Sequence, residues 1–84
     1  MNKWEICLDF FLYRQTHYMY YLISRREYLD KLARFNIKPV TGDNNRCILM
    51  TAGYLGRVTP GVYKLLKKIP HTLTYTQARK EAYG

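Results

Sequence analysis

The sequence predicts a small α+β domain, with an all-α domain as the alternative. Three observations carry this prediction. An alternating pattern of apolar residues near the N-terminus is typical of β-strands, whereas later segments repeat their apolar residues at helical spacing. A dense cluster of turn residues separates the two halves of the chain. With 84 residues, we expect one domain over residues 1–84, with a thin hydrophobic core.

The N-terminal segment predicts a β-hairpin. Its first apolar residues, which alternate with polar positions that include Glu5 and Asp9, are Trp4, Ile6, Leu8 and Phe10. A period of two residues favours a half-buried strand. A second run, rich in aromatic and β-branched residues, follows at 18–23 after a polar break. An apolar series at helical spacing also extends from residue 8 to residue 32, so one long helix remains the alternative.

Residues 25–35 predict a helix. Ser24 and Glu27 have the spacing of a capping box, in which each side chain accepts a hydrogen bond from a backbone N–H group at the helix start. The apolar residues that recur at helical spacing are Tyr28, Leu29, Leu32 and Phe35. Pro39 prevents the helix from continuing. The run 41–45, which contains Gly, Asp and Asn, predicts the main loop of the chain.

The segment 48–67 resembles the helix-turn-helix unit of nucleic-acid-binding domains. Such a unit has a small residue where two helices touch, a glycine in the turn and an apolar anchor in the second helix. Ala52, Gly56 and Val62 stand in these places. The resemblance implies a helix-turn-helix at 48–69 and a role in binding nucleic acid.

The second helix of this unit is expected to begin at Pro60 and to end before Pro70. Thr59 is a suitable N-cap, and proline is favoured at the first helical position. Apolar side chains then fall on one helix face, and the opposite face carries Tyr63, Lys64, Lys67 and Lys68. Lysine attracts phosphate, and tyrosine adds a hydrogen bond or a stacking surface. We therefore expect this face to bind nucleic acid.

The C-terminal residues predict an extended segment followed by a short helix over 76–83. Thr74 and Gln77 have the spacing of a second capping box. The alternation of threonine with Leu73 and Tyr75 is equally compatible with a short strand, as in the wing that follows a recognition helix.

The net charge of +8 is concentrated in the second half of the chain. Residues 46–84 hold seven basic residues and one acid, a net charge of +6, whereas residues 1–24 are neutral. A concentrated positive potential attracts a polyanion. We expect further phosphate contacts from Arg46, Arg57, Arg79 and Lys80. The alternative is a solvated basic surface that only keeps the protein soluble.

We expect the protein to hold no metal and no cofactor and to have no catalytic activity. The two cysteines and two histidines are isolated and lack the spacing of zinc ligands. Two reduced thiols are typical of an intracellular protein, so we expect a cytoplasmic location. The longest apolar run, 18–23, is far shorter than the roughly 20 residues of a membrane span. We also expect no signal peptide, because Glu5 and Asp9 interrupt its apolar region.

These observations together predict a small, basic, non-enzymatic nucleic-acid-binding protein, and DNA rather than RNA as its ligand. The size is typical of regulators of mobile elements or phages. The alternative is a small basic protein that binds a protein or ribonucleoprotein partner, as an inhibitor or accessory subunit. In either case the aromatic N-terminal half is expected to form the interface with a protein partner or with a second copy in a homodimer. The candidate contacts are Tyr18, Tyr20 and Tyr21, since tyrosine is enriched at interfaces.

Overall fold

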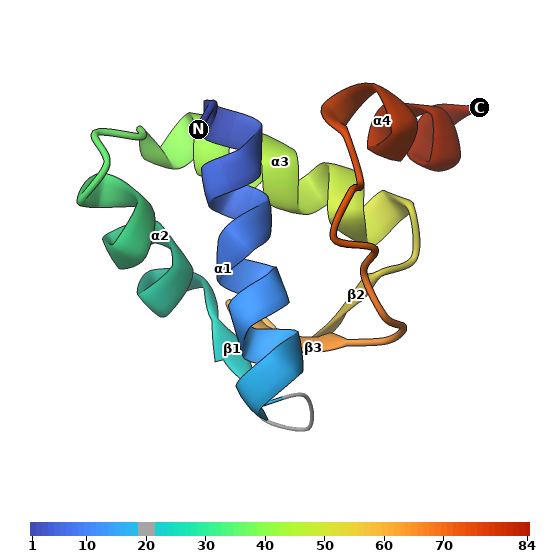
Figure 1. Ribbon diagram of the computed structural model, residues 1–84. Coiled ribbons are helices and arrows are strands. Elements are labelled where there is room, and N and C mark those ends of the chain that lie inside the picture. The colour runs from blue at the N-terminus through green and yellow to red at the C-terminus, as the bar shows by residue number, and fades with distance from the viewer. Residues whose placement is uncertain (19–21) are drawn as a thin grey trace.

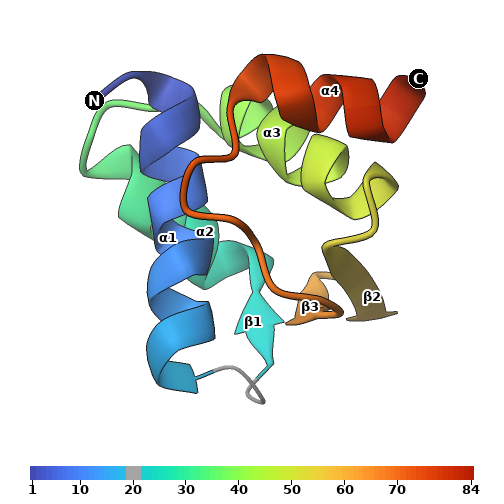
Figure 2. The ribbon, with the colours of Figure 1, turned by 45° about the vertical axis from the view of Figure 1, so that its right-hand side comes forward.

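The computed structural model describes residues 1–18 and 22–84, which form four helices and a three-stranded antiparallel sheet (Figure 1). This confirms the α+β class. The elements in chain order are α1 (Lys3–Tyr18), β1 (Ile23–Ser24), α2 (Arg25–Ala33), α3 (Pro39–Thr51), β2 (Leu55–Thr59), β3 (Val62–Leu65) and α4 (Tyr75–Tyr83). Helices α1 and α2 lie side by side, and the sheet lies at one end of the molecule (Figures 1 and 2).

Helix α1 replaces the predicted N-terminal hairpin, so that prediction is wrong. Its buried residues repeat every three or four positions and are Trp4, Cys7, Leu8, Phe11 and Gln15, which is the spacing of one helix face. The alternating pattern misled because Ile6 and Phe10 also pack, partly buried, against the core and so widen the apolar face. The Asn2 side chain accepts a hydrogen bond from the Glu5 N–H group at 2.8 Å, which satisfies one free donor at the helix start. Of the second predicted strand, residues 19–21 lie outside the described part of the chain.

The core lies where α1, α2 and α3 meet the sheet. Its largest fully buried side chains are Phe11, Ile23, Tyr28, Leu32, Leu49, Leu55, Tyr63 and Ile69. The rings of Phe11 and Tyr28 are 4.9 Å apart, centre to centre, and join α1 to α2. Each large apolar side chain stabilises the fold by about 1.5–3 kcal/mol when fully buried. Because side chains from every helix contribute, the four helices and the sheet form one domain.

The β2–β3 hairpin corrects the predicted helix over 60–69. The sheet order is β1-β3-β2, and β3 places Tyr63 opposite both Ile23 of β1 and Arg57 of β2. Pro60 and Gly61 form the turn, where the φ angle of Gly61 is +78°, a conformation that glycine adopts without strain. Tyr63 is buried and the following Lys64 is exposed, as alternate residues of a strand are. The helical pattern failed because these residues pair with a strand that is distant in sequence.

The first half of the predicted helix-turn-helix at 48–69 is also corrected. Ala52 is the C-cap of α3, and Gly56 lies within β2. Helix α3 ends because Gly53 has a φ angle of +89°, and the next N–H group, that of Tyr54, donates to the Leu49 carbonyl at 3.0 Å. This is the bond of a Schellman C-cap, which ends many helices. The chain therefore turns into a strand where the sequence predicted a second helix.

Helix α4 confirms the predicted C-terminal helix and its capping box. Thr74 Oγ1 accepts from the Gln77 N–H group at 3.1 Å, and Gln77 Oε1 accepts from the Thr74 N–H group at 3.0 Å. Figure 2 shows α4 lying next to α3. Tyr54 Oη lies 2.7 Å and 2.9 Å from the two carboxylate oxygens of Glu81. Burial, together with this bond to a carboxylate, raises the pKa of Tyr54 to about 12, so the hydroxyl stays a donor at neutral pH.

Candidate nucleic-acid interface

The site begins with α2 and α3, two packed helices joined by residues 34–38. One half of the predicted capping box of α2 is confirmed, since Ser24 Oγ accepts from the Glu27 N–H group at 2.9 Å, whereas the Glu27 carboxylate accepts from Arg14 at 3.0 Å instead. In the turn that follows the helix, Asn36 has a φ angle of +59°, and the Ile37 N–H group donates back to the Leu32 carbonyl at 3.2 Å. Asparagine is among the few residues that adopt this conformation readily. The chain thus turns sharply before α3 begins.

Helix α3 passes very close to α2 at Gly42. A Cβ atom at this position would lie 2.7 Å from Leu32 Cδ1 and 2.9 Å from Leu29 Cδ2, which is closer than nonbonded carbon atoms approach. The Tyr28 hydroxyl donates to the Gly42 carbonyl at 2.7 Å. The small residue at the contact between two helices is therefore Gly42, where the resemblance predicted Ala52. The turn residue with positive φ is Asn36, where the resemblance predicted Gly56.

The prediction of a loop at 41–45 is wrong, because this segment forms the first turns of α3. Pro39 occupies the first turn of the helix, a position where proline needs no hydrogen-bond donor and its fixed φ angle suits the helix. The residues that face the core at helical spacing are Gly42, Asn45, Arg46, Ile48 and Leu49. Because two of them are turn formers and one is charged, the apolar pattern was incomplete in the sequence.

The outer face of α3 is an uncharged stripe, hereafter the α3 stripe. Its exposed residues, spaced by three or four positions, are Val40, Asn44, Cys47 and Thr51. Residues at this spacing lie above one another along a helix. The stripe therefore presents one amide, one hydroxyl, one thiol and one branched apolar side chain along three turns of helix.

The β2–β3 hairpin is fastened beside α3 by two arginines. The Arg25 N–H group donates to the Gly61 carbonyl at 2.8 Å, and its guanidinium binds both carboxylate oxygens of Asp43 on α3 at 2.7 and 3.0 Å. The Arg46 guanidinium of α3 lies 4.6 Å from the centre of the Tyr63 ring of β3, the geometry of a cation–π contact. The hairpin is thus held against the side of α3 that carries Asp43 and Arg46.

Asp43 is the one acid at this junction among the described residues, and two cations neutralise it. It accepts hydrogen bonds from Arg25 and, at 3.2 Å, from Arg46. The bond to Arg25, with support from Arg46, keeps the pKa of Asp43 below its ordinary value although partial burial opposes this. With one carboxylate and two guanidinium groups, the cluster carries a net charge of +1 at neutral pH. Asp43 therefore does not repel an anion that approaches α3.

Two of the predicted site residues are not on the surface. Arg46 and Tyr63 are only 8% and 2% exposed, because each packs against the other between α3 and β3. Their expected place in an exposed binding face is therefore corrected, and their role in the structure is to hold the hairpin. Tyr18 is the last residue of α1, and Tyr20 and Tyr21 lie outside the described residues.

The other predicted cations are exposed but belong to three different segments. Arg57 and Lys64 lie on the hairpin, on neighbouring residue pairs of β2 and β3. Lys67 and Lys68 follow β3, and the Lys67 ammonium lies 4.5 Å from the centre of the Tyr54 ring. The two cations on α4 are Arg79 and Lys80, and Arg79 lies 5.7 and 5.8 Å from the rings of Tyr75 and Tyr83. The hairpin and α4 both pack against α3, whereas Lys67 and Lys68 lie on the segment between β3 and α4.

Neither the α3 stripe nor the cations Arg25 and Lys38 were predicted from the sequence. The usable signal was Pro39, which fits the first turn of a helix as well as the end of one. Lys38 is the N-cap of α3 and its side chain makes no capping hydrogen bond. It is exposed, at the end of α3 where the helix dipole is positive.

The described part of the chain contains no group of three or more histidine, cysteine, aspartate or glutamate side chains that could hold a metal ion. No helix over the same residues has both the length and the apolar character that crossing a membrane requires. Comparison with protein-family models, with curated proteins and with solved structures gave no match.

Proposed function

We propose that this protein is a small intracellular DNA-binding regulator that places α3 in the major groove of a duplex. The β2–β3 hairpin would then contact the neighbouring phosphate backbone. The observation that supports this most is the exposed, uncharged α3 stripe, flanked by a hairpin that carries cations. A major groove about 12 Å wide admits one α-helix. Polar side chains on such a helix can reach the base edges.

The order of elements supports the same proposal by analogy of fold. Two packed helices joined by a short turn, with the second exposed, form a helix-turn-helix in which the second helix reads DNA. Here α2 and α3 take these places, and the β2–β3 hairpin follows as a wing. The analogy concerns architecture alone, so the chemistry of the stripe and of the flanking cations has to carry the function.

The α3 stripe is suited to direct contact with bases. The Asn44 amide can both donate and accept, the combination that pairs with the major-groove edge of adenine. Thr51 can donate or accept a hydrogen bond, and the methyl groups of Val40 match the thymine methyl group. Because no stripe residue is charged, the stripe supplies selectivity, and other residues must supply the attraction to phosphate.

That attraction would come from a cation at the N-terminal end of α3 and from two cations on the hairpin. Arg57 and Lys64 project from the hairpin, and Lys38 lies at the N-terminus of α3. Each phosphate neutralised by such a group releases counterions, so the binding should weaken as salt rises.

The test is the affinity for a fluorescent mixed-sequence duplex as salt rises from about 50 to 200 mM. We expect the wild-type protein to bind, with affinity falling steeply over this range. Replacing both Arg57 and Lys64 by Glu should weaken binding at least about tenfold. The slope of the logarithm of affinity against the logarithm of salt concentration should fall by the amount expected for the loss of about two phosphate contacts. Reversing Arg79 and Lys80 on α4 to Glu changes the net charge equally, so it is the matched control, and its effect should be clearly smaller.

Three results would contradict the proposal. The wild-type protein could fail to bind duplex DNA at the lowest salt. The hairpin and α4 variants could lose affinity equally, which would indicate attraction by net charge rather than a located interface. Tighter binding to single-stranded RNA than to duplex DNA would assign the surface to another ligand.

A further inference from the structure

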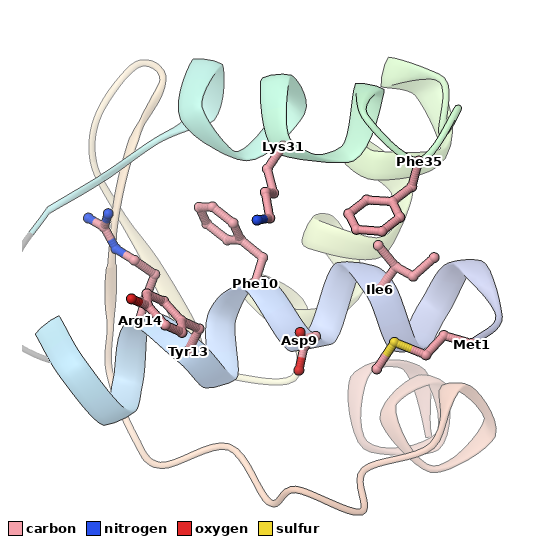
Figure 3. A pocket seen from close by; sticks show the side chains of 8 residues that line it. All are labelled: Met1, Ile6, Asp9, Phe10, Tyr13, Arg14, Lys31 and Phe35. Carbon is pink, nitrogen blue, oxygen red and sulfur yellow. The ribbon is translucent and has the colours of Figure 1, made fainter.

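A second surface, unrelated to α3, is an open groove between α1 and α2 (Figure 3). The groove encloses about 290 Å³. Its apolar centre is formed by Ile6 and Phe10 of α1 and by Phe35, which follows α2. Five further side chains line it, namely Met1, Asp9, Tyr13, Arg14 and Lys31. This groove is mainly apolar and opens to solvent.

The rim of the groove carries large side chains that the fold leaves exposed. Met1 is 81%, Tyr13 56% and Phe35 52% exposed, although all three line the same groove. Scattered apolar residues on a surface are common, but a contiguous group around a groove is typical of an interaction site. Two of these three side chains are aromatic, the residue type enriched in interface cores.

The walls of the groove carry opposite charges. Asp9 lies on α1 and Lys31 on α2, and both are exposed. Figure 3 shows the Lys31 side chain reaching from α2 toward Phe10. Within the described residues, neither Asp9 nor Lys31 has an ion-pair partner. An acid on one wall and a base on the other are thus available to a partner.

We propose that this groove is the face through which two copies of the chain form a symmetric dimer. Asp9 of each copy would then lie opposite Lys31 of the other, and the apolar rims would pack together. In a twofold interface each contact occurs twice, so the same patch must carry both members of every pair. The groove meets this requirement, because its third charged side chain, Arg14, already pairs with Glu27 at 3.0 Å and leaves Asp9 and Lys31 around an apolar centre.

The distribution of charge favours self-association through this face rather than through the other faces of the protein. The chain carries +8, so two copies repel each other where basic surfaces meet. Helix α1 has two basic and two acidic residues and is therefore neutral. An acidic or basic partner gains nothing from a patch in which both charges are balanced, whereas a copy of the same patch satisfies both.

The dimer does not depend on the proposed DNA binding. The groove is formed by α1, α2 and the residue after α2, whereas the proposed DNA contacts are on α3 and the hairpin. The two hypotheses can therefore fail separately, because self-association is measured without nucleic acid.

The experiment is sedimentation equilibrium of the wild-type protein and two charge-reversal variants, Asp9→Lys and Lys31→Asp. We expect the wild type to dimerise at or below about 100 μM. Each variant alone places like charges opposite each other twice, and its dimer should weaken at least about tenfold. An equimolar mixture of the two variants restores both opposite-charge contacts, so the mixture should dimerise with nearly wild-type affinity.

Recovery in the mixture supports the twofold arrangement, since merely unfolded or sticky variants would not complement each other. Phe35→Ser should also weaken the dimer, and Leu66→Ser is its matched control, because Leu66 is 54% exposed on another part of the molecule. A monomeric wild type, a mixture that stays monomeric, or equal effects of the two serine variants would overturn the proposal. Circular dichroism of every variant checks that it is folded.

Discussion

Replacing Gly42 by Val is expected to destabilise the protein by about 3 kcal/mol. The reason is the closeness of α2 and α3 at this residue, where even a Cβ atom would lie 2.7 Å from Leu32 Cδ1. Leu32 is fully buried and cannot move without displacing the core around it. A branched side chain would therefore push α3 away and break the 2.7 Å hydrogen bond from the Tyr28 hydroxyl to the Gly42 carbonyl.

The measurement is urea denaturation of Gly42→Val beside two reference variants. Gly42→Ala adds one methyl group but gains up to about 1 kcal/mol of helix propensity, so its loss should be much smaller. Asn44→Val puts the same side chain on the exposed face of the same helix and should change stability by no more than about 1 kcal/mol. Equal stabilities for Gly42→Val and Asn44→Val would show that α2 and α3 do not touch at Gly42.

Replacing Gln15 by Leu is expected to destabilise the protein by about 3 kcal/mol. The buried Gln15 amide pairs with both backbone groups of Ile69, donating to its carbonyl at 2.9 Å and accepting from its N–H group at 2.7 Å. Ile69 is fully buried, so leucine would leave two backbone groups without partners and without water. Each unpaired buried group costs about 1–3 kcal/mol.

Hydrogen exchange locates this effect. In Gln15→Leu the Ile69 amide should lose protection before the amides of α2 and α3 do, because the bond fastens the segment between β3 and α4 to α1. Thr16→Val is the control, since the exposed Thr16 hydroxyl bonds only to the Leu12 carbonyl of its own helix. An unchanged Ile69 protection factor in Gln15→Leu would contradict the assigned contact.

The parts of the fold that could be predicted are those set by local chemistry. The capping pairs Ser24 with Glu27 and Thr74 with Gln77 stand three residues apart, so the starts of α2 and α4 are visible in the sequence. Such bonds form between near neighbours whatever the rest of the chain does. Both predicted helices are confirmed.

The hairpin could not be predicted in the same way, because its strands are short and β1, the third strand of the sheet, is distant in sequence. Val62–Leu65 has apolar residues compatible with a strand or a helix, and the pairing of Tyr63 with Ile23 decides between them. For a short segment, tertiary contacts override intrinsic propensity. Thr59-Pro60-Gly61 was interpreted as the start of a helix, and the positive φ of Gly61 makes it a turn instead.

The candidate site was located by charge, and this explains what the sequence missed. Charge indicated Arg57 and Lys64, which are exposed on the hairpin that Arg25 and Arg46 join to α3. Charge could not reveal the α3 stripe, because the residues of the stripe are uncharged. One of them, Asn44, also lies in the run 41–45, whose composition is typical of turns. Charge also selected Arg46, whose guanidinium is held inside by Asp43 and Tyr63.

The central claim is that α3 and the hairpin form the surface that binds duplex DNA. Its most direct test is amide chemical-shift mapping of the ¹⁵N-labelled protein during titration with a mixed-sequence duplex. We predict that the largest shifts fall on the α3 stripe, on Lys38 and on the hairpin from Arg57 to Lys64, with smaller shifts on α4 and in the α1–α2 groove. Shifts confined to α4 or to that groove, or none at low salt, would contradict the claim.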